Sequence, residues 1–391
     1  MIAGLKEKFG FWDQDTVSKF KSSNDCLWFH GVSVGELNAI WPLVCEIHKK
    51  VQNPIVISTT TKAGHKHAKN LIGKQSFTLI FFPFDFLNII RKIFSYTKIK
   101  AIIIAESEIW PNLINMAHKK NIKIIAVNAK ISDRSFKNYK LLRIIFNRVF
   151  AKYDLILTQS ETDKVKFLAL NAHKERVKNI GNIKFAEQSI SQSLNFSIDK
   201  GNNIFITFAS THPGEEELAL RVFKEIIKSY KNIRLIIAPR HIERRQDVYN
   251  IVLNTKFNPI LRSTNTQIKN QQDIFILDSI GELTSLYKVS DITVLCGSFV
   301  PIGGHNILEP IRAGSYTIIG PYDFKTKELT KPFIESNAIT QVQDENDLLK
   351  EINKVINNER LKDIKIAKGK EILNKNANIL EQYTNEIIKL L

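Results

Sequence analysis

The chain has 391 residues, 43% of them hydrophobic and 24% charged, so it is long enough for two folded domains and has the composition of a globular protein. Its three cysteines are odd in number and far apart, which argues against a disulfide framework. The formal net charge is +17, and residues 1–190 carry 30 Lys and Arg against 15 Asp and Glu, whereas residues 191–391 carry 26 against 24. An excess confined to one half predicts an anionic partner for that half: nucleic acid, an anionic membrane or an acidic substrate.

Short β runs alternate with helical patterns through the first half of the chain. The predicted strands are 26–32, 54–60, 77–84, 101–107, 122–129 and 154–160. Helical patterns lie between them, for example at 36–50 and 136–150. Continuous β-branched runs between helices predict parallel strands that are buried on both faces.

The second half repeats this plan. Its predicted strands are 203–210, 233–240, 273–279, 292–298 and 316–321. Two such sets predict an α/β protein of two Rossmann-like doubly wound domains facing a central cleft. The polar stretch 181–203 separates them, and we place the domains at 1–188 and 189–391. The last segment, 376–391, is an amphipathic helix that can cap either domain, including the first.

In open α/β sheets, ligands bind beyond the carboxyl ends of the strands, and polar residues follow most of these strands. In "HGVSVGE", Glu36 lies in the first turn of a helix, where it is either a general base or a capping acid. In "ESEIWPNLI", Glu106 and Glu108 follow a strand, where they either act on a substrate or cap the helix at Trp110 and Pro111.

Strand-end loops in the second half fit a nucleotide. Arg240 follows a strand and is able to pair with a phosphate, and Gly281 opens a predicted helix with free N–H groups. In "FVPIGGHNILEPIRAG" (299–314), glycines permit positive φ or close approach of a ligand. A helix starting near Asn306 would direct its positive dipole end at a phosphate, and Glu309 would accept hydrogen bonds from ribose hydroxyls.

Several common signatures do not occur in the sequence. There is no HExxH or CxxC, which argues against metal chemistry, and no GxxxxGK[ST] or GxGxxG, which argues against an NTPase and a dinucleotide oxidoreductase. No RNP-type aromatic motif or helix-turn-helix is recognisable, which argues against a nucleic-acid-binding protein.

Taken together, the motifs resemble the 3-deoxy-D-manno-octulosonic acid (Kdo) transferases of lipopolysaccharide assembly. The matching motifs occur in order along nearly the whole chain: "HGVSVGE", "TTTKAG", "PFD", "ESEIWPNLI", "NAKISDRS", "GNIKF", "STHPGEEE", "PRH", "GEL", "GSFVPIGGHNILEP" and "GPYDF". The resemblance implies a B-type glycosyltransferase fold, the donor CMP-Kdo, the acceptor lipid IVA, and inversion with no nucleotide-bound metal and no cofactor. It assigns the first domain to the lipid acceptor and the second to the donor.

The resemblance also implies roles for individual residues. Glu36 is the expected base for the acceptor hydroxyl, and Glu106 and Lys184 are expected to stabilise the transition state. The expected CMP-binding residues are Pro239, Arg240, Gly281, Glu282, Leu283, Asn306, Ile307, Leu308 and Glu309.

The sequence departs from the family pattern in three places. It begins at "GLKEKFG" where family members have an apolar anchor helix, so we expect peripheral attachment to the cytoplasmic face of the inner membrane through basic and aromatic surface. "GNIKFAE" lacks an Asp after Phe185, and "ESE" replaces Glu-Thr-Glu. The alternatives are a glycosyltransferase of the same fold with a UDP-sugar donor, or a basic nucleic-acid-binding protein.

Overall fold

The computed structural model describes residues 4–106, 108–186, 198, 200–264 and 267–391, and it divides into two units. The first unit comprises residues 1–188 with 376–391, and the second comprises residues 189–375. The predicted domain boundary at 188/189, like Ser107 of "ESE", lies outside the described residues. The terminal segment belongs to the first unit, where its helix (α17, Ile379–Ile388) contacts helix α3 (Val34–Val51).

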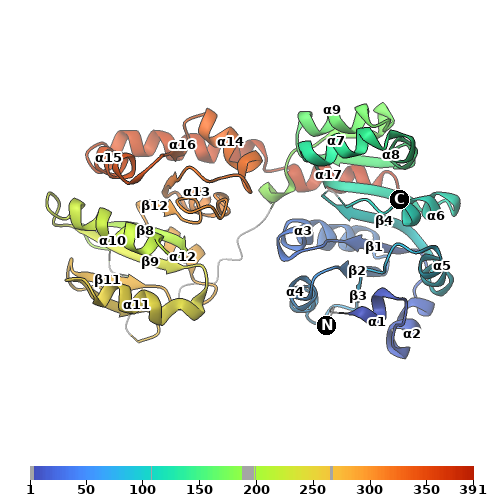
Figure 1. Cartoon of the computed structure of the whole chain (residues 1–391), viewed down its shortest axis with the longest axis horizontal. Coiled ribbons are helices and arrows are strands. Elements are labelled where there is room, and N and C mark those ends of the chain that lie inside the picture. The colour runs from blue at the N-terminus through green and yellow to red at the C-terminus, as the bar shows by residue number, and fades with distance from the viewer. Residues whose placement is uncertain (1–3, 107, 187–197, 199, 265–266) are drawn as a thin grey trace. The chain divides into compact units, whose positions relative to one another are not determined.

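A seven-stranded parallel sheet forms the centre of the first unit, in the order β3-β2-β1-β4-β5-β6-β7 (Figure 1). The strands are β1 (Cys26–His30), β2 (Ile55–Thr59), β3 (Thr78–Phe81), β4 (Ile99–Ala105), β5 (Lys123–Ala129), β6 (Leu155–Thr158) and β7 (Val177–Asn179). The helices are α1 (Leu5–Lys8), α2 (Gln14–Ser22), α3 (Val34–Val51), α4 (Lys62–Ile72), α5 (Leu87–Tyr96), α6 (Pro111–Lys119), α7 (Asp133–Leu141), α8 (Arg143–Phe150), α9 (Glu161–Ala169) and α17 (Ile379–Ile388), with 3-10 turns η1 (Lys174–Arg176) and η2 (Ile183–Ala186). The helix predicted at 136–150 is therefore two helices, which meet at Leu142.

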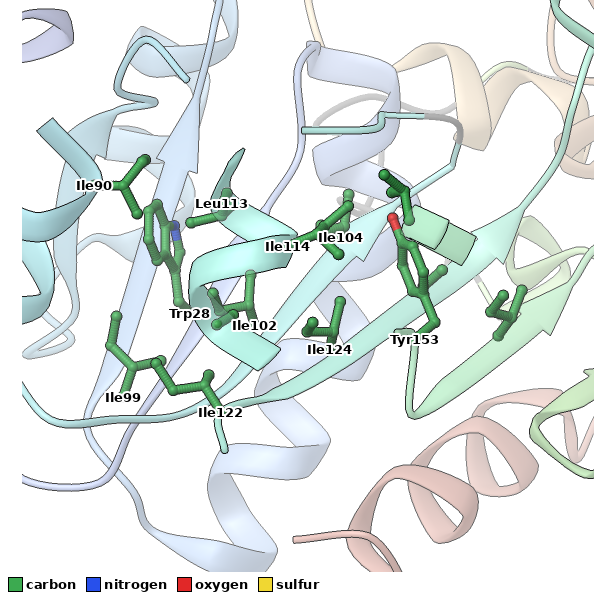
Figure 2. Close-up of a cluster of buried hydrophobic side chains, with 14 of the residues drawn as sticks. Trp28, Ile90, Ile99, Ile102, Ile104, Leu113, Ile114, Ile122, Ile124 and Tyr153 are labelled. Atoms are coloured by element: carbon green, nitrogen blue, oxygen red, sulfur yellow. The ribbon is translucent and has the colours of Figure 1, made fainter. Parts of the chain in front are cut away.

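Both faces of this sheet are buried, because successive strand residues point to opposite sides. In β4, Ile102 and Ile104 join a core with helices α5, α6 and α8, whereas Ile103 and Ala105 join a second core with α3, α4 and α17. Figure 2 shows the first of these cores, in which the buried indole of Trp28 lies among isoleucine and leucine side chains.

The second unit has the same plan, with a parallel sheet in the order β10-β11-β9-β8-β12-β13-β14. Its strands are β8 (Ile204–Thr211), β9 (Ile233–Pro239), β10 (Asn258–Leu261), β11 (Asp273–Ile276), β12 (Ile292–Leu295), β13 (Tyr316–Ile319) and β14 (Thr340–Gln341). Its helices are α10 (Glu215–Ile226), α11 (Arg245–Leu253), α12 (Leu283–Tyr287), α13 (Leu308–Ala313), α14 (Lys327–Glu335), α15 (Glu345–Ile356) and α16 (Glu359–Lys375), with a 3-10 turn η3 (Ile242–Arg244). The doubly wound α/β class predicted from the sequence is confirmed in both units.

Candidate active site

Each sheet has one point at which the strand order reverses, and ligands of such folds bind there, beyond the carboxyl ends of the two strands. In the first unit this point lies between the neighbouring strands β1 and β4. Glu36 lies on the helix that follows β1, and Glu106 directly follows β4. The topology therefore brings these two carboxylates, which are 70 positions apart in the sequence, to one edge of the sheet.

Glu36 forms a capping box at the start of α3. Its backbone N–H donates to Ser33 Oγ (3.4 Å), while its carboxylate accepts from Val32 N–H (2.8 Å) and from the Ser33 hydroxyl (3.2 Å). Burial raises the pKa of Glu36, and the charges of Glu106 and Glu108 raise it further against the effect of these hydrogen bonds. The capping role considered from the sequence is thus present, and the same carboxylate is made more basic than an ordinary glutamate.

Glu106 is held in an unusual backbone conformation beside a cation. Its φ is 56°, a left-handed value that is uncommon for a residue with a side chain. Lys130, which follows β5, forms an ion pair with its carboxylate at 2.6 Å. Burial also raises the pKa of the nearby Glu108. The edge of the sheet thus carries three carboxylates (Glu36, Glu106 and Glu108), of which one is paired with a lysine in the described contacts.

A buried histidine lies at the end of β1. Nδ1 of His30 lies 2.9 Å from Ser58 Oγ, its ring centroid lies 4.0 Å from that of Phe82, and burial lowers its pKa to about 3. Nε2 of His30 and Nε1 of Trp110 are buried without a hydrogen-bond partner in the described part of the structure. His30 is therefore neutral at pH 7, and its ring packs against Phe82 and Trp110.

Lys184 lies on η2, which packs against α3, the helix that carries Glu36. Asn128, near the end of β5, accepts a hydrogen bond from Ile183 N–H at 3.0 Å and so fixes the start of this turn to the carboxyl edge of the sheet. The backbone N–H of Lys184 donates to Asn182 Oδ1 at 3.0 Å. The segment of Lys184 thus belongs to the same unit as Glu36 and packs against the helix that carries Glu36.

The reversal point of the second unit lies between β8 and β12. Glu215, at the start of α10, is fully buried and accepts three backbone N–H groups: from His212 (3.0 Å), Gly297 (2.8 Å) and Phe299 (3.0 Å). Burial raises the pKa of Glu215 and these hydrogen bonds oppose the rise. A single carboxylate therefore ties the loop after β8 to the loop after β12.

Two histidines meet at this point. The rings of His212 and His305 are stacked with a centroid distance of 5.2 Å, and their Nε2 atoms lie 3.0 Å apart. Burial, followed by the charge of Arg240, lowers the pKa of His305 to about 4, and burial also lowers the pKa of His212. With both rings neutral, one Nε2–H donates to the other ring, and the surrounding cations such as Lys325 leave the site electropositive.

The predicted nucleotide residues lie at strand ends, in loops or in the first turns of helices at the carboxyl edge of this second sheet. Pro239 ends β9, and the exposed Arg240 donates its backbone N–H to Thr211 at the end of β8. Gly281 and Leu283 flank Glu282, whose carboxylate accepts from Arg262 at 2.9 Å and from the Ser279 hydroxyl. The Glu282 carboxylate therefore forms its hydrogen bonds to residues of the second unit.

The helix predicted near Asn306 begins at Leu308 and has only six residues. Asn306 Oδ1 accepts the Leu308 N–H at 3.0 Å, so this side chain caps the helix itself. Ile307 and Leu308 are fully buried, which leaves their backbone as the part able to meet a ligand. Glu309 accepts from Thr284 at 3.0 Å, which joins the start of α13 to α12.

Packing explains the glycines of this motif more directly than a ligand does. Gly303 and Gly304 have φ of 103° and 83°. A Cβ on Gly303 would lie 2.6 Å from the Phe324 ring, and one on Gly304 would lie 2.7 Å from Thr326 Oγ1. Positive φ was expected from the sequence, but the close approach is made by the chain's own loop.

Sequence reasoning missed the groups that organise both sites. Lys130, Glu215 and the pair His212–His305 were not predicted as site residues. Only Glu215 has a signal in the sequence, because "GEEE" places three acids in one helical turn, which is more than the N-terminus of a helix requires.

Comparison with known proteins identifies the family. A family model described as 3-Deoxy-D-manno-octulosonic-acid transferase (kdotransferase) matches residues 3–187. The 3-deoxy-D-manno-octulosonic acid transferase of Rickettsia typhi is 31% identical over 371 residues, which cover 92% of this chain and 79% of that protein. The chain belongs to the Kdo transferase family. Another relative, the bifunctional glycosyltransferase/methyltransferase of Fusobacterium nucleatum, is 35% identical over 87% of this chain, and the chain spans 54% of its length.

Solved structures establish the fold of this Kdo transferase family member. The UDP-GlcNAc 2-epimerase of Neisseria meningitidis, bound to UDP-GlcNAc, matches 93% of this chain and 100% of its own with a TM-score of 0.63. At 10% sequence identity this similarity concerns the fold alone. It confirms the predicted B-type glycosyltransferase fold. Among the described helices, none has the length and apolar character to cross a bilayer.

Proposed function

We propose that this protein transfers Kdo from CMP-Kdo to lipid IVA, the tetraacyldisaccharide 1,4'-bisphosphate, with inversion at the anomeric carbon. Membership of the Kdo transferase family supports the donor sugar. The net charge of residues 1–190, 30 cationic against 15 anionic side chains, supports an acceptor with two phosphates on the first unit. In this proposal the second unit binds the CMP portion of the donor.

The observation that carries the proposal is the position of Glu36. It lies at the reversal point of the first sheet, and burial raises the pKa of its carboxyl group. A more basic carboxylate is better suited to accept the proton of a sugar hydroxyl as that oxygen attacks. One such base suffices for a single inverting displacement, in which CMP departs with the electron pair of the broken C–O bond.

The other predicted residues take complementary roles. Lys184 and Glu106 stabilise the transition state, the cation by offsetting the charge that develops on the leaving phosphate. Pro239, Arg240, Gly281–Leu283 and Asn306–Glu309 hold CMP. In this proposal the side chains of Lys184 and Arg240 supply the neutralising charge, so the reaction needs neither a cofactor nor a metal on the nucleotide.

The test distinguishes a role of Glu36 as the general base from a role as a helix cap. Glu36→Gln keeps a hydrogen-bond acceptor for Val32 and Ser33 but removes the base, so transfer should fall by about 10²- to 10⁴-fold. Glu36→Ala should lose transfer to the same extent and also lose about 1 kcal/mol of stability, whereas Ser33→Ala should lose mainly stability. Products would be weighed after incubation with CMP-Kdo and lipid IVA, and CMP and UDP binding would be compared by thermal shift. Substantial transfer by Glu36→Gln would show that Glu36 only caps its helix and does not act as the base. Stabilisation of the protein by UDP in place of CMP would overturn CMP-Kdo as the donor.

A further inference from the structure

An aliphatic corner is exposed where α7 passes into α8. The exposed fractions are 83% for Leu141, 51% for Leu142, 73% for Ile144 and 53% for Ile145. Single exposed aliphatic residues are ordinary, but four within five positions form one contiguous patch. We refer to residues 141–145 as the α7–α8 corner (Figure 1).

The helix break at Leu142 explains why these side chains have no cover. Phe146 and Phe150 of α8 pack against Tyr139 of α7, with ring centroids 4.4 and 5.9 Å apart, and they form the inward face of the helix pair. The corner precedes that face, and α7 has no buried residue at all. The fold thus projects the corner away from the core.

The surroundings of the corner are cationic. The exposed cations on the two helices are Arg134, Lys137, Lys140, Arg143 and Arg148. The one acid in residues 133–150 is Asp133, which forms an ion pair with Lys166 at 2.8 Å. Aliphatic side chains flanked by Lys and Arg are complementary to a bilayer surface that carries anionic headgroups.

The corner lies on the helix pair beside the carboxylate cluster of the first unit. Burial raises the pKa of Tyr139, and the charge of Glu108 raises it further, which places α7 within electrostatic reach of Glu108. An acceptor that is a lipid would be presented from a bilayer close to these carboxylates.

We propose that the α7–α8 corner docks this protein on an anionic phospholipid bilayer, with the four aliphatic side chains inserted at headgroup level and the flanking cations on lipid phosphates. The proposal rests on the proposed function, because a lipid acceptor must be reached where it resides. It names an aliphatic and basic surface for the peripheral attachment, which the sequence analysis expected through basic and aromatic surface.

The test is co-sedimentation of the full chain with vesicles of phosphatidylcholine and phosphatidylglycerol in equal parts, and with phosphatidylcholine alone. Leu141→Ser/Ile144→Ser should lower partitioning to the mixed vesicles at least about tenfold at any salt concentration. Arg143→Gln/Arg148→Gln should lower it about twentyfold at low salt, with a smaller effect at high salt. The matched control is Val165→Ser/Leu253→Ser, which removes two exposed aliphatic residues elsewhere (59% and 54% exposed) and should change nothing.

Transfer to detergent-dispersed acceptor distinguishes this proposal from the function. Variants of the corner should retain that activity while losing vesicle binding. A chain that transfers in detergent but ignores the vesicles, or corner variants that bind them as the control does, would overturn the docking surface and leave the function intact. A change from dimer to monomer in sedimentation velocity, with vesicle binding unaltered, would assign the corner to a second copy of the chain.

Discussion

Glu215 offers the sharpest test of how the second unit is organised. Replacing it with Gln puts one carbonyl oxygen and one NH2 group where a carboxylate now accepts N–H groups of His212, Gly297 and Phe299. Hydrogen bonds to a charged group contribute about 1.5–3 kcal/mol each, but burial raises the pKa of this carboxyl group and so offsets part of their sum. We therefore expect Glu215→Gln to cost about 3 kcal/mol.

For a unit of this size, that loss corresponds to a Tm about 6–12 °C lower. The assay is thermal unfolding with and without CMP, followed through the transition that CMP shifts. Because Glu215 fixes the loop after β12, CMP affinity should fall together with Tm. The control is Glu225→Gln on the same helix, where an exposed pair with Lys228 contributes no more than about 0.5 kcal/mol. A loss below about 1 kcal/mol with unchanged CMP affinity would show that the three hydrogen bonds do not hold the two loops together.

Three further predictions concern pH. The base Glu36 must be ionised and burial raises its pKa, so kcat/KM should fall with decreasing pH around a midpoint above 4.5; a midpoint at or below 4.5 would contradict this environment. Lys130→Met leaves the Glu106 charge without its partner, so that midpoint should move upward, and a downward shift would contradict the arrangement. The pKa of His305 is about 4 in the folded protein, against 6.5 in the unfolded chain. The stability that the neutral ring contributes is therefore present above pH 6.5, and up to about 3 kcal/mol of it is lost as the pH falls to 4. Unfolding free energies of the wild type and His305→Asn, measured from pH 7 to 4, should therefore converge, and parallel curves would refute the assignment.

The sequence predicted every strand inside the two sheets and the edge strand β3, but it missed the other three edge strands. All eleven predicted strands are present, whereas β7, β10 and β14 were not predicted, and each of them is an edge strand. Their sequences, "VKN", "NPIL" and "TQ", are short and carry no continuous β-branched run. An edge strand packs on fewer neighbours, so its sequence need not be apolar throughout.

The candidate site divides in the same way. Glu36 and Glu106 were predictable because each directly follows a strand or begins the next helix, which is a local property of the sequence. Glu215 was not, because its role depends on backbone N–H groups of Gly297 and Phe299, more than 80 residues away. Contacts of that kind follow from the strand order and have no local signature.

The terminal helix has a consequence for how the chain is synthesised. Ile379, Tyr383 and Ile387 of α17 are at most 2% exposed and belong to the core shared with α3 and α4. A ribosome therefore delivers a missing part of the first unit only after the whole of the second has emerged. Until then, the first half of the polypeptide exposes the apolar surface that α17 later covers. A fragment ending near residue 188 should therefore aggregate unless residues 376–391 are supplied.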